Sequence, residues 1–167
     1  RWGYDGERPF VLVPLSVLSS EGPGFALGIE RILEILSDRY QIVMSRGRLS
    51  GSTEPQTRGN LTVFDWIPSI DEYLQACDLI ISRAGHTTIL GALVYGKPLV
   101  IIPIPDHPEQ SGNARRASAL GVAEVLTASQ LTADSLGSAI DSVLRSPQFT
   151  TKATQIREIA RSMSGVE

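Results

Sequence analysis

Residues 78–104, "DLIISRAGHTTILGALVYGKPLVIIPI", contain two runs rich in Ile, Leu and Val with a helix-like segment between them. The apolar runs are 78–82 and 99–104, and continuous apolar runs of this length are typical of strands buried on both faces. The segment at 86–96 ends at a Gly-Lys-Pro that stops a helix. Two such strands joined by a helix form a right-handed crossover in a parallel sheet. The stretch therefore predicts a β-α-β unit with the polar turn "RAG" at the start of its helix.

The same alternation extends along the rest of the chain. For the helix at 69–77, Ser69 and Glu72 have the spacing of a capping box. Strands that alternate with helices predict a single doubly wound, Rossmann-like α/β domain with about six parallel strands. The further predicted strands are 10–14, 41–45, 61–67 and 122–126, and the further predicted helices are 24–38, 69–77, 109–121, 132–145 and 148–163.

Composition narrows the class of protein. The chain has 167 residues, which fits one domain, and its net charge of −3 does not favour nucleic acid as a partner. Its longest apolar stretch is too short to span a bilayer. The single cysteine, Cys77, excludes an intrachain disulfide and fits a reducing compartment such as the cytoplasm. The chain starts at Arg1 without a signal-peptide pattern, so we expect it to be a segment of a longer protein.

Polar segments follow three of the predicted strands. They are "LSVLSSEGPG" at 15–24, "RAG" at 83–85 and "PDHPEQ" at 105–110. In doubly wound sheets, ligands bind beyond the carboxyl ends of the strands, near the point where the strand order reverses. We therefore expect these segments to meet in one cleft, with the apolar run at 99–104 buried between them.

The first two segments have features of a phosphate-binding site. Gly22 and Gly24 precede a helix, where backbone N–H groups can face a phosphate, although an ordinary turn is the alternative. The spacing is not the dinucleotide fingerprint, and Arg46 instead of an acidic residue follows the second strand, which leaves NADP open. In "SRAGHTT" we expect Gly85 to relieve the turn. Arg83 and the unsatisfied N–H groups of the next helix suit a diphosphate; a capped helix with a surface arginine is the alternative.

The third segment suits a sugar. Glu109 and Gln110 offer acceptors and a donor that fit vicinal hydroxyls, whereas the alternative is an acidic first turn that complements the helix dipole. His107 has no His or Cys partner at metal-ligand spacing, so we expect no metal site. No Gly-x-Ser-x-Gly motif supports hydrolase chemistry.

Taken together, residues 78–114, "DLIISRAGHTTILGALVYGKPLVIIPIPDHPEQSGNA", resemble the C-terminal, donor-binding half of GT-B glycosyltransferases. The resemblance is to the family 28 type and also to family 1, and it extends more loosely over 10–126. It implies an inverting transferase that uses a nucleotide diphosphate sugar, usually UDP-linked, with no cofactor and no metal. The resemblance also implies that acceptor site and general base belong to an N-terminal domain, fused or on a separate subunit. Residues 1–167 are then a nucleotide-sugar-binding domain that meets a membrane only through a lipid acceptor, at the inner face.

The resemblance also assigns roles to individual residues. The loop with Ser16, Gly22 and Gly24 would lie near the phosphates, and residues 64–67, which include Trp66 and Ile67, would flank the base. The residues around the diphosphate would be Arg83, Gly85, His86, Thr87 and Thr88. Those at the sugar would be Glu109 and Gln110, with Asn113 supporting that loop.

One departure affects nucleotide recognition. Family members commonly have a Glu that holds the ribose diol eight residues after the Arg of this turn, and here that position is Gly91. Two alternatives stay open. One is a UDP-sugar 2-epimerase-like domain, which "PDHPEQ" does not match well. The other is a non-catalytic nucleotide-sugar-binding module, which Gly91 favours.

Overall fold

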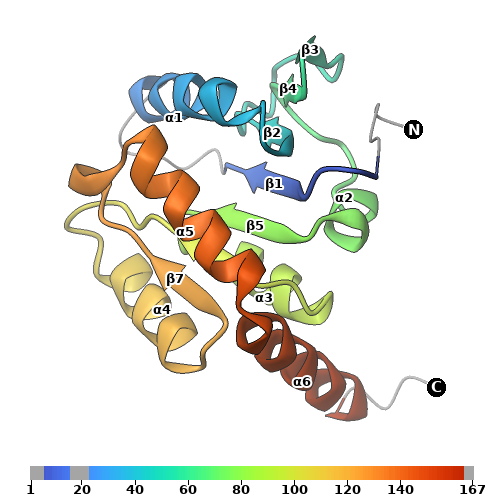
Figure 1. Ribbon diagram of the computed structural model, residues 1–167, viewed down its shortest axis with the longest axis vertical. Helices are drawn as coiled ribbons and strands as arrows, with labels where there is room; N and C mark the ends of the chain where they lie inside the picture. The colour runs from blue at the N-terminus through green and yellow to red at the C-terminus, as the bar shows by residue number, and fades with distance from the viewer. Residues whose placement is uncertain (1–5, 16–22, 164–167) are drawn as a thin grey trace.

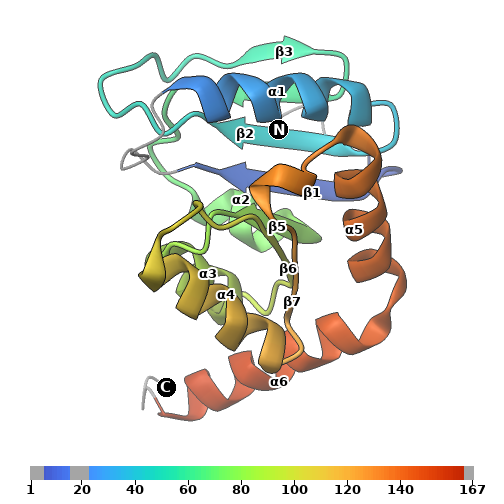
Figure 2. The same cartoon turned by 90° about the vertical axis from the view of Figure 1, so that its left-hand side faces the viewer.

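The computed structural model describes residues 6–15 and 23–163 as a sheet covered by helices on both faces (Figures 1 and 2). The strands are β1 (Phe10–Pro14), β2 (Gln41–Ser45), β3 (Gln56–Arg58), β4 (Leu61–Phe64), β5 (Leu79–Ser82), β6 (Leu99–Ile101) and β7 (Ala123–Val125). The helices are α1 (Pro23–Leu36), α2 (Asp71–Ala76), α3 (His86–Val94), α4 (Pro108–Ala119), α5 (Ala133–Arg145) and α6 (Pro147–Met163), with a 3-10 turn at Ala128–Gln130.

The strand order is β3-β4-β2-β1-β5-β6-β7. All neighbouring strands are parallel except β3, which pairs antiparallel with β4. The chain builds outward from β1 through β2 to β4 and then returns to place β5 on the other side of β1. The strand order therefore reverses between β1 and β5, and the prediction of a doubly wound sheet is confirmed.

The antiparallel edge strand β3 was not predicted. Its three residues, "QTR", are all exposed and lie inside a stretch rich in Gly, Ser and Pro, which the sequence indicated to be a loop. Short polar edge strands are common because the outer edge of a sheet faces water. The hydroxyl oxygens of Thr57 and Thr62, 3.3 Å apart, link β3 to β4 across this edge.

Alternation along the strands divides the core into two layers. Phe10 and Leu12 of β1 point into a layer shared with α2, α3, α4 and α6, and Val11 and Val13 point into a layer shared with α1 and α5. All four side chains are fully buried. The continuous apolar runs therefore mark strands covered on both faces, as predicted. Helix α6 leaves the α5 side and packs against α3 (Figure 2).

The capping box predicted at Ser69 and Glu72 is wrong. Helix α2 begins only at Asp71, its N-cap is Ile70, and no side chain caps it. Ile70 takes the N-cap position instead and is partly buried against the core. A reciprocal capping box occurs instead at the start of α5, where the Ser135 N–H donates to the Thr132 hydroxyl at 3.1 Å and the Thr132 N–H donates to Ser135 Oγ at 2.9 Å.

None of the helices in the described ranges is long and apolar enough to cross a membrane.

Candidate functional site

The carboxyl edge of the sheet brings together the starts of α1, α3 and α4 and the segment after β4. Arg83 lies at the strand-order reversal, directly after β5, and only 7% of it is exposed. Its guanidinium carbon lies 3.5 Å from the centre of the Phe25 ring, in the first turn of α1. A stacked arginine keeps its charge and has less rotational freedom than one extended into water. Arg83 is therefore not a surface arginine: its side chain is buried and is held at the start of α1 by stacking on Phe25.

The first predicted loop lies mostly outside the described residues. Ser16 and Gly22 belong to this undescribed part. Gly24 is in the first turn of α1 and is exposed, and a Cβ there would meet nothing within 4 Å. Its backbone is thus accessible beside Phe25.

The turn after β5 has its unusual backbone conformation at Ala84. Ala84 has φ 63°, whereas Gly85 has φ −62° and ψ 134° as the N-cap of α3. The expectation that Gly85 relieves the turn is therefore wrong. Two side chains hold Ala84: its N–H donates to Ser82 Oγ at 3.1 Å, and its carbonyl accepts from the Asn113 side chain at 3.1 Å.

The N-terminus of α3 faces the same edge. Gly85, the N-cap, has no side chain that could accept from the first N–H groups of the helix. His86 and Thr87 are exposed, and Thr88 is half-buried. The first N–H groups of the helix are donors without helical partners and lie at the positive end of its dipole. A Cβ on Gly85 would have only the Thr88 hydroxyl, at 3.9 Å, as a near neighbour. The turn is therefore open to a ligand that accepts hydrogen bonds.

The start of α4 is shaped by its own side chains. The Gln110 N–H donates to Nδ1 of His107, the N-cap, at 3.4 Å, and Glu109 is exposed in the first turn. Gln110 is 9% exposed, and its amide oxygen accepts from the Ile104 N–H at 2.9 Å. The oxygen of Gln110 is thus already used by the β6–α4 turn.

Asn113 has a hydrogen-bond partner other than the one expected. It was expected to support the loop of Glu109 and Gln110, and in the structure its amide reaches the carbonyl of Ala84. A half-buried side chain on α4 therefore connects the helix that carries Glu109 with the turn that carries Arg83.

Trp66 and Ile67 follow β4. Ile67 is 7% exposed and belongs to the same buried cluster as Ala84 and Ile89. Trp66 is half-buried, and its backbone N–H donates to the backbone carbonyl of Ser52 at 3.3 Å. The segment is thereby joined through the core to the turn that begins α3.

Gly91 lies on α3 opposite α2. A Cβ there would be 3.6 Å from Cδ1 of Leu74, which is an ordinary contact distance. The backbone therefore has room for an added Cβ at this position.

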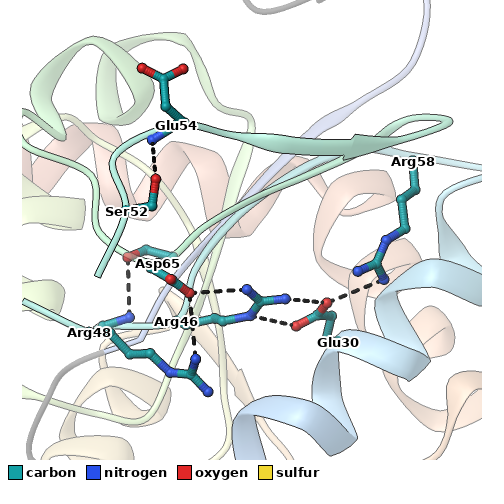
Figure 3. Close-up of polar contacts among 9 residues, drawn as sticks. Glu30, Arg46, Arg48, Ser52, Glu54, Arg58 and Asp65 are labelled. Atoms are coloured by element: carbon teal, nitrogen blue, oxygen red, sulfur yellow. Dashed lines mark hydrogen bonds and ion pairs between the residues drawn. The ribbon is translucent and has the colours of Figure 1, made fainter. Parts of the chain in front are cut away.

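Arg46, which left NADP open in the sequence, is fully engaged by acidic neighbours. It donates to both carboxylate oxygens of Glu30, at 2.8 and 2.7 Å, and to Asp65 at 3.0 Å (Figure 3). This pairing gives Arg46 a role inside the protein and argues against a 2′-phosphate ligand.

Sequence reasoning missed Phe25 and Ser82 as parts of the site. Phe25 was not singled out in the predicted helix at 24–38, although an aromatic residue right after the glycine turn at a carboxyl edge was a usable signal. Ser82 is the last residue of a buried strand, and its polar side chain, 1% exposed, marks it as a turn-holding residue. Within the described ranges, no three His, Cys, Asp or Glu side chains gather as a metal site would require.

Comparisons with known proteins define the class to which this fold and edge belong. The chain has the fold of the C-terminal half of GT-B glycosyltransferases: it superposes on the glycotransferase of kitacinnamycin with a TM-score of 0.76 at 22% identity, over 96% of this chain and 41% of that one. It also superposes on the glycosyltransferase VinC in complex with DTDP, with a TM-score of 0.67 at 22% identity, over 91% and 37% of the two chains. The sequence profile of the glycosyltransferase family 28 C-terminal domain matches residues 25–165, and the chain belongs to this family.

Two curated relatives show the range of the family. A UDP-N-acetylglucosamine–N-acetylmuramyl-(pentapeptide) pyrophosphoryl-undecaprenol N-acetylglucosamine transferase of Bacillus cereus is 34% identical over 83% of this chain and 39% of its own length. The demethyllactenocin mycarosyltransferase of Streptomyces fradiae is 28% identical over 95% of this chain and 33% of its own length. The chain thus spans between a third and two fifths of these relatives.

Proposed function

We propose that residues 1–167 form the nucleotide-sugar-binding domain of an inverting glycosyltransferase. The observation that carries this proposal is the buried, Phe25-stacked Arg83 beside the uncapped N-terminus of α3. A fixed positive charge and a row of N–H donors at a strand-order reversal suit a diphosphate. Relatives that are glycosyltransferases agree with this chemistry.

The proposal assigns each segment at the carboxyl edge to the diphosphate, the sugar or the base of the donor. Arg83 and the first amides of α3 bind the diphosphate, with Gly85, His86, Thr87 and Thr88 around it. Glu109 and the amide of Gln110 meet the sugar hydroxyls. The donor-binding set also includes the first loop, with Ser16, Gly22 and Gly24; the base-flanking pair, Trp66 and Ile67; and the supporting Asn113.

In the proposed reaction, an acceptor hydroxyl attacks the anomeric carbon as the bond to the diphosphate oxygen breaks. Negative charge grows on the leaving diphosphate, and Arg83 and the α3 dipole are placed to stabilise it. The hydroxyl proton passes to a general base in an acceptor domain, fused to this domain or on a separate subunit. On this proposal, residues 1–167 bind donor without transferring sugar.

The nucleotide is proposed from the relatives together with Gly91. The Bacillus cereus relative is named for a UDP-linked sugar, whereas VinC is solved in complex with DTDP. Without a carboxylate at 91, both UDP and dTDP are expected to bind. A lipid-linked acceptor, as in the name of the Bacillus cereus relative, would place the reaction at the cytoplasmic face of a membrane.

Titration calorimetry of the chain with UDP, dTDP, ADP and NADP tests the donor assignment. We expect UDP and dTDP to bind at one site and NADP not to bind. Robust sugar transfer by the 167-residue chain alone would contradict the assignment of the general base to another domain. Failure of every nucleoside diphosphate to bind would contradict the donor site itself.

A further inference from the structure

Five charged side chains cluster beside the residues assigned to the nucleobase (Figure 3). Four of them lie near the carboxyl ends of β2 and β4, and Arg58 reaches the cluster from β3, opposite the start of β4. The five are Glu30 of α1, Arg46 after β2, Arg48 in the following loop, Arg58 of β3 and Asp65 after β4. Besides the three hydrogen bonds of Arg46, the cluster has ion pairs from Arg58 to Glu30 at 3.4 Å and from Arg48 to Asp65 at 3.7 Å. The cluster thus joins α1, β2, β3 and β4 at the edge where ligands bind.

Its centre is mostly shielded from water. The side chains of Glu30, Arg46 and Asp65 are 6%, 11% and 20% exposed. Hydrogen bonding to Glu30 raises the pKa of Arg46, and hydrogen bonding from Arg46 lowers the pKa of Asp65, so both stay charged at neutral pH. Arg46 and Asp65 are only partly buried, and their attraction offsets the cost of withdrawing them from water. We therefore interpret the pair by the geometry that it enforces and not by a gain in stability.

That geometry concerns the backbone next to Asp65. The Arg48 N–H donates to the Asp65 carbonyl at 2.8 Å, and the Trp66 N–H donates to the Ser52 carbonyl at 3.3 Å. An added Cβ on Gly51 would overlap with Cβ of Asp65, an approach that real Cβ atoms do not make. The loop at 47–54 is therefore packed against residues 65–66 with no room for one methyl group.

We propose that the loop at 47–54, together with the Arg46–Asp65 pair, positions Trp66 and Ile67 against the nucleobase of the donor. Asp65 immediately precedes Trp66, and Ile67 is anchored in the core. Because Ile67 is fixed, a displacement of Asp65 must change the position of Trp66. The diphosphate is held from the other side of β1, by Arg83 and α3, so the loop acts on the base and not on the phosphates. This inference rests on the proposed function.

The test compares UDP with inorganic pyrophosphate, by calorimetry on the unmodified protein and on three variants. Gly51→Ala forces the loop away from Asp65, and Asp65→Asn removes the charge while keeping the side-chain size. Gly28→Ala is the matched control, because Gly28 is exposed on α1 and a Cβ there meets nothing within 4 Å. We expect Gly51→Ala and Asp65→Asn each to weaken UDP binding at least tenfold, which is about 1.4 kcal/mol, with pyrophosphate affinity within about twofold of the unmodified protein.

The inference is overturned if Asp65→Asn and Gly51→Ala bind UDP with the same affinity as the unmodified protein. It is also overturned if the variants lose UDP and pyrophosphate in equal measure, because that result indicates general disruption of the edge. Should Gly51→Ala fail to fold, Asp65→Asn alone decides between these outcomes. An unmodified protein that binds neither UDP nor dTDP would instead contradict the proposed function.

Discussion

Ala84 has a left-handed backbone, φ 63°, at the centre of the proposed diphosphate turn. This conformation costs roughly 1–2 kcal/mol for a residue with a Cβ. Ser82 and Asn113 hold the two polar backbone groups of Ala84 and offset that cost. From the sequence, Arg83 and the uncapped helix were predictable because charge and helix position are local. The location of the strain was not, because it depends on an amide 29 residues away on α4.

Replacing Asn113 by alanine should therefore weaken diphosphate binding. Without the Asn113 donor, the Ala84 carbonyl can rotate, and the first N–H groups of α3 are no longer held toward the diphosphate. We therefore expect the affinity for UDP to fall about tenfold while the affinity for uridine is unchanged. Asn60→Ala is the control: the Asn60 side chain also donates to a backbone carbonyl, that of Ser37 at 2.9 Å, away from the site. Both variants should lose about 1 kcal/mol of unfolding free energy. Equal UDP affinity in the two variants would show that Asn113 has only a structural role.

Gly91 gives a second prediction at this scale. Because no carboxylate can reach a ribose diol from this position, UDP and dUDP should bind within about tenfold of each other, or roughly 1.4 kcal/mol. Gly91→Glu, whose Cβ would make an ordinary contact with Leu74, should bring a preference for UDP. Calorimetry with both nucleotides measures the ratio. A hundredfold preference for UDP in the unmodified protein would reveal a ribose ligand elsewhere.

At the scale of elements, α1 and α5 pack closely on one face of the sheet. A Cβ on Gly137 of α5 would lie 2.9 Å from Nη1 of Arg39 and 3.1 Å from Cδ2 of Leu36. Beside this contact, the Tyr40 hydroxyl donates to Asp141 at 2.6 Å, and Arg39 and Arg145 pair with the same carboxylate. The helices themselves were predictable from their periodicity. Their close contact was not, because it joins residues about a hundred positions apart.

This contact predicts a dependence of stability on pH. The hydrogen bond from Tyr40, with smaller help from the arginines, lowers the pKa of Asp141. A carboxylate with a lowered folded-state pKa stabilises the protein above its unfolded pKa of about 3.9, and this contribution is lost as the pH falls through the folded value. Asp141→Asn should therefore reduce unfolding free energy at pH 7 by about 1 kcal/mol, with the difference shrinking below pH 4 or so. Denaturant unfolding at several pH values measures it, and a difference that persists unchanged at acid pH would contradict this explanation.

At the scale of the whole molecule, alternation of strands and helices predicted six of the seven strands in the described part of the chain and the edge at which α1, α3 and α4 begin. The edge strand β3 escaped because three exposed polar residues carry no hydrophobic signal. The role of Arg46 was not predicted either: the sequence left a ligand open for it, whereas in the structure it pairs with Glu30 and Asp65. In each case the deciding contacts lie between distant elements, which a local pattern does not show.

The central claim is that a nucleoside diphosphate binds through its phosphates at Arg83 and the start of α3. Calorimetric titration of UDP and of uridine into Arg83→Ala tests it most directly, with Arg161→Ala, an exposed arginine on α6, as the matched control. We predict that Arg83→Ala weakens UDP by roughly 1.5–3 kcal/mol, the range for a hydrogen bond to a charged group, and leaves uridine unchanged. Arg161→Ala should bind both like the unmodified protein. An equal loss of UDP and uridine in Arg83→Ala, or no loss of either, would contradict the account.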